Sequence, residues 1–397
     1  MNFQISEEGT RLQQRSRRLA ADFATRAATH DQEASHPLEN YAALRREGFY
    51  SLNVPPEMGG EGVGLLNYSL AAEELAQGCP ATALSFNMHL SIIGPLFESP
   101  IVPPDTKQRL ADLVVKEQRL IAGNFSEPRT SGLLATYRPA TRARQVAGGY
   151  QITGRKAFAS MLEAADFCAV LAHPEEVDKP GAALLLMVPR RAQGRRVDEI
   201  WDTLGMRATR SDSLILEDCF VSQDAVLYQT DDILPFIRSG ANWLWASYTA
   251  VYLGVAAAAY NAVRELVQER VPRGYTQPMA YHPDVRRRVA DMSVDLEAAR
   301  LLTYHSAWLS DTQGPTSETV AALFRAKYLV GEAGARITRT ALTLGGAHAL
   351  FKTVPLERLF RDGAVGPVQF PPSDYCLSSV GTLELGLDPG EIVPPLK

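Results

Sequence analysis

The sequence contains few cysteines, and their spacing suits neither a disulfide framework nor a metal site. The four cysteines, Cys79, Cys168, Cys219 and Cys376, lie far apart, and no CxxC spacing occurs. Such a pattern is typical of reduced, mostly buried thiols in a cytoplasmic protein, with pairing left open. The seven histidines are scattered, and no His, Cys or carboxylate cluster has metal-ligand spacing. We therefore expect a cytoplasmic protein without a metal centre.

The chain also lacks a large charge of one sign and a long hydrophobic run. A net charge of −5 argues against a nucleic-acid partner, which would favour a basic face. The apolar run Tyr248–Ala259 is too short to cross a bilayer. The opening residues, MNFQISEEGTRLQQRSRRLAADF, are amphipathic and charged, unlike a signal peptide. The sequence therefore predicts no nucleic-acid partner and no membrane association.

What is present is the composition of a globular protein with more than one domain. The chain has 397 residues, of which 46% are hydrophobic and 21% charged. Apolar residues recur at helical spacing in 1–118, and short β-branched or aromatic segments between turns fill 119–228. Long helical patterns return in 229–397. This order predicts an α+β fold: an N-terminal helical domain, a central β-barrel or β-sandwich domain and a C-terminal four-helix bundle.

Four segments of the first two predicted domains combine turn residues with hydroxyl, aromatic or charged side chains. They are Leu52–Gly62 (LNVPPEMGGEG), Phe125–Gly132 (FSEPRTSG), Ile152–Asp166 (ITGRKAFASMLEAAD) and Thr203–Leu216 (TLGMRATRSDSLIL). The predicted bundle adds Gln268–Met279 (QERVPRGYTQPM), Gly345-Gly346 and Leu359–Asp362 (LFRD). In this order, the segments resemble the motifs of the acyl-CoA dehydrogenase family of FAD flavoenzymes, over almost the whole chain. The resemblance implies FAD as cofactor, an acyl thioester as substrate and a homo-oligomer, usually a dimer of dimers.

The resemblance also assigns residues to the flavin ring. Phe125 and Ser126 would meet its pyrimidine part, where hydrogen-bond donors stabilise the negative charge of the reduced ring. Phe158 would lie against the isoalloxazine, and Ser160 would donate near its N5 atom. A plain alternating strand is the other interpretation of this second segment. Ser131 is assigned to the substrate pocket, although the sequence around it departs from the family's Gly-Ser-Asp.

The adenosine end of FAD is assigned to the predicted bundle. The family's arginine, which binds the pyrophosphate of a neighbouring subunit's FAD, matches Arg270, with Arg273 as a second candidate. A fixed cation suits phosphate in either position. Gly345 and Gly346 match the glycine pair near the adenosine, where the absence of two Cβ atoms allows close approach. The family's usual glutamine is replaced by Leu342.

The residues that normally perform the family's chemistry are missing. The usual glutamate, nine residues after the family's arginine, is replaced by Phe370. The other known base position, eleven residues before Gly254, holds Trp243, and the arginine that often grips CoA is replaced by Trp245. Trp243, Trp245 and Phe370 are therefore predicted to wall an aromatic substrate pocket.

Two residues remain as catalytic candidates. Asp374, four residues after Phe370, could act as a general base, because an apolar site would raise its pKa. It could equally cap or solvate the last helix. His89, on a helix that lines the pocket in relatives, could donate to oxygenated flavin or to a carbonyl. The alternative is a core histidine with satisfied hydrogen bonds.

Three functions follow from the resemblance. The first is an FAD oxidoreductase that oxidises an acyl thioester, on CoA or on a carrier protein, by an unusual dehydrogenation or by using O₂. The second is a flavin-dependent monooxygenase, which acts on a small organic substrate and needs no α-proton base. The third is a catalytically silent flavoprotein that serves as a partner subunit.

Overall fold

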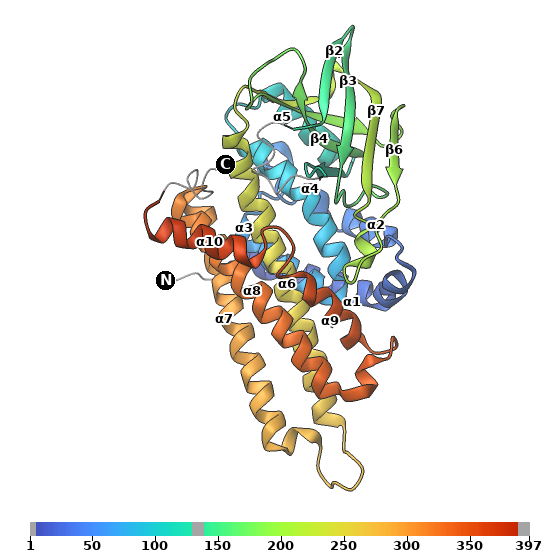
Figure 1. Cartoon of the computed structure of the whole chain (residues 1–397), viewed down its shortest axis with the longest axis vertical. Helices are drawn as coiled ribbons and strands as arrows, with labels where there is room; N and C mark the ends of the chain where they lie inside the picture. Colours follow the sequence, from blue (N-terminus) through green and yellow to red (C-terminus); the bar gives the residue numbers. More distant parts are fainter. Residues whose placement is uncertain (1–4, 129–138, 388–397) are drawn as a thin grey trace, which may run out of the picture.

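The protein is elongated, with a β-sheet at one end and a bundle of long helices that runs to the other (Figure 1). The structure is a computed structural model that describes residues 5–128 and 139–387. It confirms the predicted α+β class, with helices first, a sheet next and a helical bundle last. The predicted limits 1–118, 119–228 and 229–397 stay predictions.

The N-terminal part is helical because its apolar residues repeat at helical spacing and its first helix is well capped. Leu12, Leu19 and Phe23 lie on one buried face, and the Ser6 hydroxyl accepts the amide of Gly9 at 3.0 Å. Its α-helices are α1 (Glu7–Glu33), α2 (Leu38–Arg46), α3 (Leu65–Gly78), α4 (Pro80–Glu98) and α5 (Pro104–Ala111). Short helical turns are η1 (Phe49–Ser51), η2 (Pro56–Met58) and the π-helical η3 (Asp112–Lys116).

The middle part forms one mixed sheet with the strand order β6-β7-β3-β2-β4-β5-β8, and β1 pairs with β4 in parallel. Its strands are β1 (Ile121–Asn124), β2 (Arg142–Val146), β3 (Gly149–Lys156), β4 (Phe167–Pro174), β5 (Ala183–Pro189), β6 (Arg195–Asp198), β7 (Ser213–Ser222) and β8 (Val226–Thr230). Two helical turns, η5 (Arg207–Thr209) and η6 (Gln223–Ala225), join them. The buried strands β4 and β5 carry near-continuous apolar runs, as expected of strands that are covered on both faces.

The C-terminal part is built on three long helices that pack against one another and against α3 and α4 (Figure 1). They are α6 (Leu234–Glu269), α7 (Pro283–Gln313) and α8 (Ser317–Gly345), followed by α9 (Pro355–Val365) and α10 (Ser373–Glu384). The turns η7 (Met279–Tyr281) and η8 (Gly346–Leu350) precede α7 and α9. A side chain at Gly254 of α6 would lie 2.3 Å from the carbonyl oxygen of Glu73 in α3, so only glycine allows this close helix packing.

One short segment joins all three parts of the molecule. Arg207 of η5 donates from Nε to the carbonyl oxygen of Asp31 at 3.0 Å, which links the middle part to α1. Arg361 of α9 pairs with the carboxylate of Asp31, and Asp362 accepts the amide of Met206 at 2.6 Å. Arg361-Asp362 is therefore the anchor that its sequence suggested, with partners in α1 and η5.

All four cysteines are free and buried. Within the described residues, no group of three or more His, Cys, Asp and Glu side chains could hold a metal ion. No helix in 5–128 or 139–387 combines the length and apolar character needed to cross a membrane.

Candidate flavin and substrate site

The two segments assigned to the flavin ring lie side by side. The amide of Ala157 donates to the carbonyl oxygen of Ser126 at 2.9 Å. The residues that follow β3 therefore lie beside the residues that follow β1. Beneath this contact, Lys156 donates to Glu127 and to the carbonyl oxygen of Leu171, both at 2.6 Å. Burial lowers the pKa of Lys156 to about 8, and the carboxylate opposes this shift. The buried ion pair thus holds the two segments together.

Phe158 has the exposure and backbone expected of a residue that meets a ligand. Its side chain is 67% exposed although it is aromatic, and its φ of 52° lies in the left-handed region. An aromatic residue is rare there, and such strain is found mainly at functional sites. Its ring contacts Trp201 edge-on at 6.1 Å between centroids. Phe125, on the neighbouring segment, is half-buried against the main core.

Ser160 ends a chain of hydroxyl groups. Thr209 donates to the carbonyl oxygen of Met206 at 2.9 Å and lies 2.8 Å from Ser211, whose Oγ is 2.6 Å from that of Ser160. Because each hydroxyl has one hydrogen, donation along the chain towards Met206 leaves the oxygen of Ser160 as an acceptor. The sequence analysis expected a donor at this position.

A second group of residues surrounds Met88 of α4. The end of β1 packs on this helix so tightly that a side chain at Gly123 would lie 3.3 Å from the carbonyl oxygen of Met88. On the other side, the hydroxyl of Tyr248 in α6 lies 3.8 Å from the sulfur of Met88, and it also hydrogen-bonds the Gln369 side chain. Asn124 is buried next to Gly123, and among the described residues neither the oxygen nor the nitrogen of its amide group has a hydrogen-bond partner. The strand that leads to Phe125 and Ser126 therefore packs on α4, and the Met88 side chain of this helix meets Tyr248 of α6.

The two aromatic residues at the missing base and CoA positions belong to one cluster between α6, α8 and α10. Trp245 lies 4.8 Å from Phe324, and Phe370 lies 5.4 Å from Tyr375, measured between ring centroids. Both belong to a separate apolar cluster that also contains Cys376. The indole nitrogen of Trp245 is buried without a hydrogen-bond partner.

Trp243 lies elsewhere, against α4. Its indole nitrogen donates to Glu98 at 2.7 Å, and the second oxygen of Glu98 accepts from Ser239 at 3.1 Å. Its ring covers Gly94, where a side chain would lie 2.5 Å from the ring. The three predicted wall residues therefore do not form one surface. The structure also reveals a carboxylate, Glu98, beside one of the family's two base positions, 145 residues away along the chain.

Both catalytic candidates have ordinary structural surroundings. His89 is fully buried: its Nε2 donates to the carbonyl oxygen of Tyr50 at 2.8 Å, and its Nδ1 accepts the amide of Ile121 at 3.1 Å. Burial lowers the pKa of His89 to about 4, so the ring is neutral. Asp374 is exposed in the first turn of α10 rather than set in an apolar site. The positions of both residues match the structural alternatives, a core histidine and a helix-terminal carboxylate.

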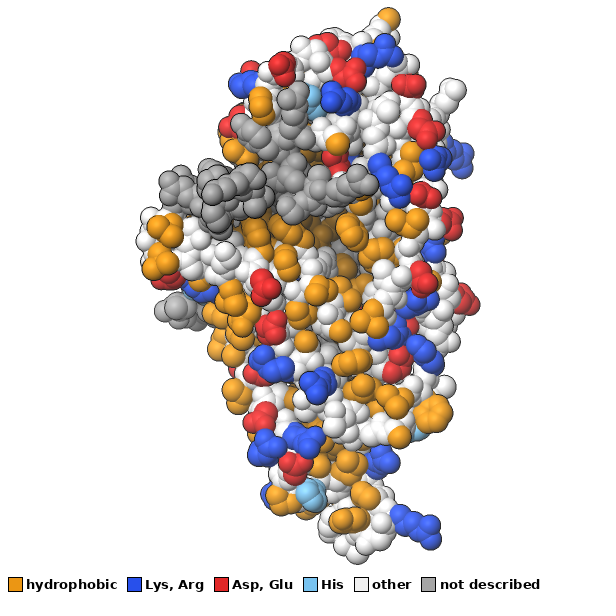
Figure 2. Space-filling view, in the orientation of Figure 1, with side chains coloured by type: hydrophobic (Ala, Val, Ile, Leu, Met, Phe, Trp, Pro, Cys, Tyr) orange, Lys and Arg blue, Asp and Glu red, His pale blue; other side chains and the backbone are white. Residues whose placement is uncertain are grey.

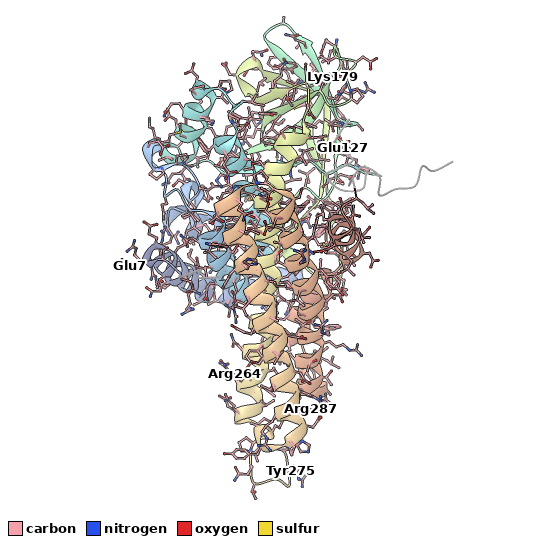
Figure 3. The ribbon with its side chains drawn as sticks, turned by 90° about the vertical axis from the view of Figure 1, so that its left-hand side faces the viewer. Glu7, Glu127, Lys179, Arg264, Tyr275 and Arg287 are labelled. Atoms are coloured by element: carbon pink, nitrogen blue, oxygen red, sulfur yellow. The ribbon has the colours of Figure 1, made fainter. Side chains whose placement is uncertain are left out.

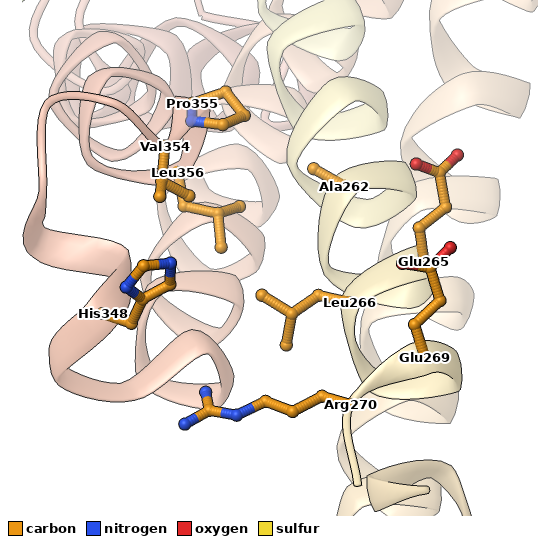
Figure 4. Close-up of a pocket in the computed structure, with 9 residues that line it drawn as sticks. All are labelled: Ala262, Glu265, Leu266, Glu269, Arg270, His348, Val354, Pro355 and Leu356. Carbon is orange, nitrogen blue, oxygen red and sulfur yellow. The ribbon is translucent and has the colours of Figure 1, made fainter.

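Of the residues assigned to the adenosine end, Arg270 lines a separate cavity of about 740 Å³ between α6, η8 and α9 (Figure 4). Arg270 extends across it and donates to the carbonyl oxygen of Gly345 at 3.2 Å. Two carboxylates and a histidine share the cavity: Glu265, Glu269 and His348. Arg270 is thus a cation beside the glycine pair of its own chain, and its predicted contact with FAD pyrophosphate stays a prediction.

The glycine pair serves two different purposes. A side chain at Gly345 would lie 2.5 Å from the Cβ of Ala349, so this position is dictated by packing within the chain. At Gly346, no atom of the described residues lies within 4 Å of the place that a Cβ atom would occupy, and the φ of 67° favours glycine. Arg273, the second candidate, is exposed in the loop before α7. Ser131 lies outside the described residues.

Sequence reasoning did not find Tyr248, Gln369 or Glu98. Gln369 adjoins Phe370, and Tyr248 is three residues after Trp245, so both were within reach of the motif comparison. Glu98 gave no local signal, because its relation to Trp243 exists only after α4 and α6 pack.

The helix–sheet–helix order defines an architecture found in two kinds of solved structure. Butyryl-CoA dehydrogenase from Megasphaera elsdenii matches with a TM-score of 0.88 at 22% identity, covering 97% of this chain and 100% of the other. FMN-bound TdsC from Paenibacillus sp. A11-2 matches with a TM-score of 0.85 at 22% identity, covering 95% and 97%. At this level of identity, the likeness shows the fold.

Sequence comparison identifies the family. Residues 6–99, 123–219 and 235–368 match the N-terminal, middle and C-terminal domains of acyl-CoA dehydrogenase. YdbM of Bacillus subtilis, a protein named as an acyl-CoA dehydrogenase, is 30% identical over 358 residues, which are 90% of this chain and 92% of that relative. The chain therefore belongs to the acyl-CoA dehydrogenase family.

Proposed function

We propose that this protein is an FAD-dependent oxidoreductase that oxidises an acyl thioester or a similar carbonyl compound in an O₂-using reaction. The observation that carries the proposal is the filling of the usual base position by Phe370, which packs on Tyr375 in an apolar cluster. A phenyl ring cannot accept the α-proton that dehydrogenation removes. A monooxygenase reaction, in which a separate electron donor reduces the flavin before O₂ reacts, has no need of that step.

The residues present fit a bound flavin. Phe158 offers an exposed ring held in a strained backbone, beside the carbonyl and hydroxyl groups of the Ser126 segment. Buried Asn124, whose amide atoms have no hydrogen-bond partner among the described residues, supplies further hydrogen-bonding capacity near this segment. When bound, FAD would supply two-electron redox chemistry, and these residues would hold and orient it.

The arrangement of the two half-sites supports a homo-oligomer. The Arg270 cavity is built by the last turns of α6, which run towards the loop carrying Tyr275 (Figure 3). We call the two adjacent segments Phe125–Glu127 and Lys156–Ser160 the flavin cradle. The loop with Tyr275 lies at the opposite end of the molecule from Glu127 of this cradle (Figure 3). A second copy would bring its Arg270 to the flavin bound by the first. Exposed apolar side chains such as Phe351, Val368 and Leu385 would suit burial between copies.

A second candidate function is α,β-dehydrogenation of an acyl thioester with an unusual base. The observation that favours it is Glu98, whose carboxylate lies 2.7 Å from the indole nitrogen of Trp243, at the family's other base position. The dehydrogenases among the sequence relatives favour it as well.

Anaerobic mixing of the FAD-loaded protein with a panel of acyl-CoAs separates the two candidates. We expect no bleaching of the oxidised flavin band, followed by substrate consumption when chemically reduced protein meets O₂ and the same thioester. Bleaching under anaerobic conditions would instead establish dehydrogenation, and Glu98→Gln should then abolish it. Asp374→Asn is the control carboxylate variant, and it should keep both flavin and turnover. Flavin that responds to neither treatment would identify a silent partner subunit and contradict both candidates.

A further inference from the structure

A network of polar groups meets at Gln369, the residue before Phe370, which stands where the family usually has its base. The hydroxyl of Tyr252 donates to the side-chain oxygen of Gln369, and Tyr248 hydrogen-bonds the same side chain. Since the hydroxyl of Tyr248 donates to the sulfur of Met88, the NH₂ group of Gln369 is the partner that can donate to the oxygen of Tyr248. The hydrogen of Tyr248 is then directed away from Gln369.

The only other partner found for the Tyr248 hydroxyl within the described residues is a weak one. It lies 3.8 Å from the thioether sulfur of Met88, which is a poor acceptor. The backbone carbonyl of Met88 faces Gly123 at the end of β1, two residues before Phe125. Burial raises the pKa of the Tyr248 phenol, so it keeps its proton. Within the described residues, the Tyr248 hydroxyl therefore donates only to the weak acceptor Met88, and it also meets the side chain of Gln369, the residue before Phe370.

A buried cation lies behind the same network. Lys327 of α8 is 1% exposed, and its ammonium donates to the carbonyl oxygens of Gly366 and Gln369 at 2.8 and 3.2 Å. It also lies 5.7 Å from the ring centroid of Tyr252. Within the described chain, it has no ion-pair partner. A buried cation without a counter-charge favours negative charge nearby, and it fixes the backbone that carries Gln369.

We propose that Tyr248 donates a hydrogen bond to an oxygen of the substrate, and that Gln369 and Lys327 are the residues that position it. The oxygen belongs to a carbonyl or phenol next to the reacting carbon, and it gains negative charge as the substrate binds or reacts. This rests on the proposed function, because it places the substrate beside the flavin. It adds the chemistry by which the site recognises that substrate.

Ligand binding to the FAD-loaded protein tests the proposal. The probes are 4-chlorophenol, its oxygen-free analogue chlorobenzene, and acetoacetyl-CoA, which ionises to an enolate; each is followed by the change in the flavin spectrum. Tyr248→Phe should lower the binding affinity for 4-chlorophenol, for acetoacetyl-CoA or for both by about tenfold. This is the effect of losing one hydrogen bond to a charged oxygen. Chlorobenzene should bind both proteins equally. Tyr228→Phe, a buried tyrosine on β8, is the matched control and should change nothing.

The source of the oxygen follows from which probe responds. If Tyr248→Phe weakens the binding of 4-chlorophenol alone, the substrate is phenolic. If it weakens the binding of acetoacetyl-CoA alone, the substrate is a thioester. Equal binding of both oxygen-bearing probes to the wild type and to Tyr248→Phe would overturn the proposal. Loss of FAD itself from the wild-type protein would instead contradict the proposed function.

Lys327 is tested by a separate measurement, the pH at which the bound phenol ionises. A purely structural role of Lys327 would leave this pH unchanged. In the wild type, the bound phenol should ionise at a lower pH than in water, because the ammonium stabilises the phenolate. Lys327→Met should shift this ionisation to higher pH, and Lys327→Arg should restore it in part. An unchanged ionisation in a folded, FAD-loaded Lys327→Met protein would remove Lys327 from the site.

Discussion

Single residues show how burial alters chemistry that the sequence leaves open. His89 was a candidate donor, and the packing of α4 against η1 and β1 uses both of its ring nitrogens. His36 is similar: its Nδ1 donates to the carbonyl oxygen of Ala208 at 3.0 Å, and its ring is buried against Tyr41. Burial lowers the pKa of each ring to about 4. Neither ring can gain a proton without loss of stability.

The expected consequence is a loss of stability in mild acid. Both folded pKa values lie below the unfolded value of 6.5, so unfolded chains bind protons first as the pH falls. Stability should be complete above pH 6.5 and decline towards pH 4, by about 3 kcal/mol for each histidine. Unfolding in denaturant at several pH values measures this. His36→Gln and His89→Gln should each reduce the dependence of the free energy of unfolding on pH between 6.5 and 4. An unchanged pH dependence would assign the acid sensitivity to other groups.

At the scale of elements, the flavin cradle depends on a contact between two strands. Lys156 closes β3, and Glu127 follows β1, so their buried ion pair fixes the relative position of the segments that carry Phe158 and Ser126. Motif comparison found both segments, but not the pair beneath them. A lysine and a glutamate in sequence give no sign that both will be buried.

We expect Lys156→Met to disturb both stability and flavin binding. It removes the ammonium that donates to the buried Glu127 carboxylate and to the carbonyl oxygen of Leu171, and such losses cost roughly 3 kcal/mol. The free energy of unfolding should fall by that order, and the protein should bind FAD more weakly. Lys179→Met is the control: this lysine pairs with Asp231 at the exposed surface of the same sheet domain (Figure 3). An equal effect of the two substitutions would show that the buried pair has no special role.

At the scale of the whole molecule, the two parts of the proposed cofactor site, for the adenosine end and for the flavin ring, lie far apart within one chain. The Arg270 cavity and the flavin cradle lie towards opposite ends of the molecule (Figure 3). Hydrophobic side chains gather across the middle of one face (Figure 2), as a surface covered by another subunit would require. FAD binding and assembly should therefore depend on each other.

Replacement of Arg270 tests this dependence. Arg270→Ala should release FAD on dilution, with an affinity about tenfold or more below the wild type, because a cation–phosphate contact is lost. Arg273→Ala, an exposed arginine three residues further on, should retain FAD. Flavin fluorescence after gel filtration measures both, together with oligomer size. Equal retention of FAD by the two variants would separate the cavity from cofactor binding.

The sequence by itself determined the fold class, the family and the segments of the flavin cradle. Hydrophobic periodicity, turn residues and motif spacing are local properties, so they are visible before the chain folds.

Only the tertiary structure decided what surrounds Phe370 and Trp243, the two positions where the family's base is missing. It divided Trp243 from Trp245 and Phe370, and it placed Glu98 beside Trp243. It also brought Tyr248 and Lys327 to Gln369 from two different helices. These partners lie many residues apart along the chain, and no local pattern records which helices will pack together. The surroundings that set their hydrogen bonds and charge therefore exist only in the folded protein.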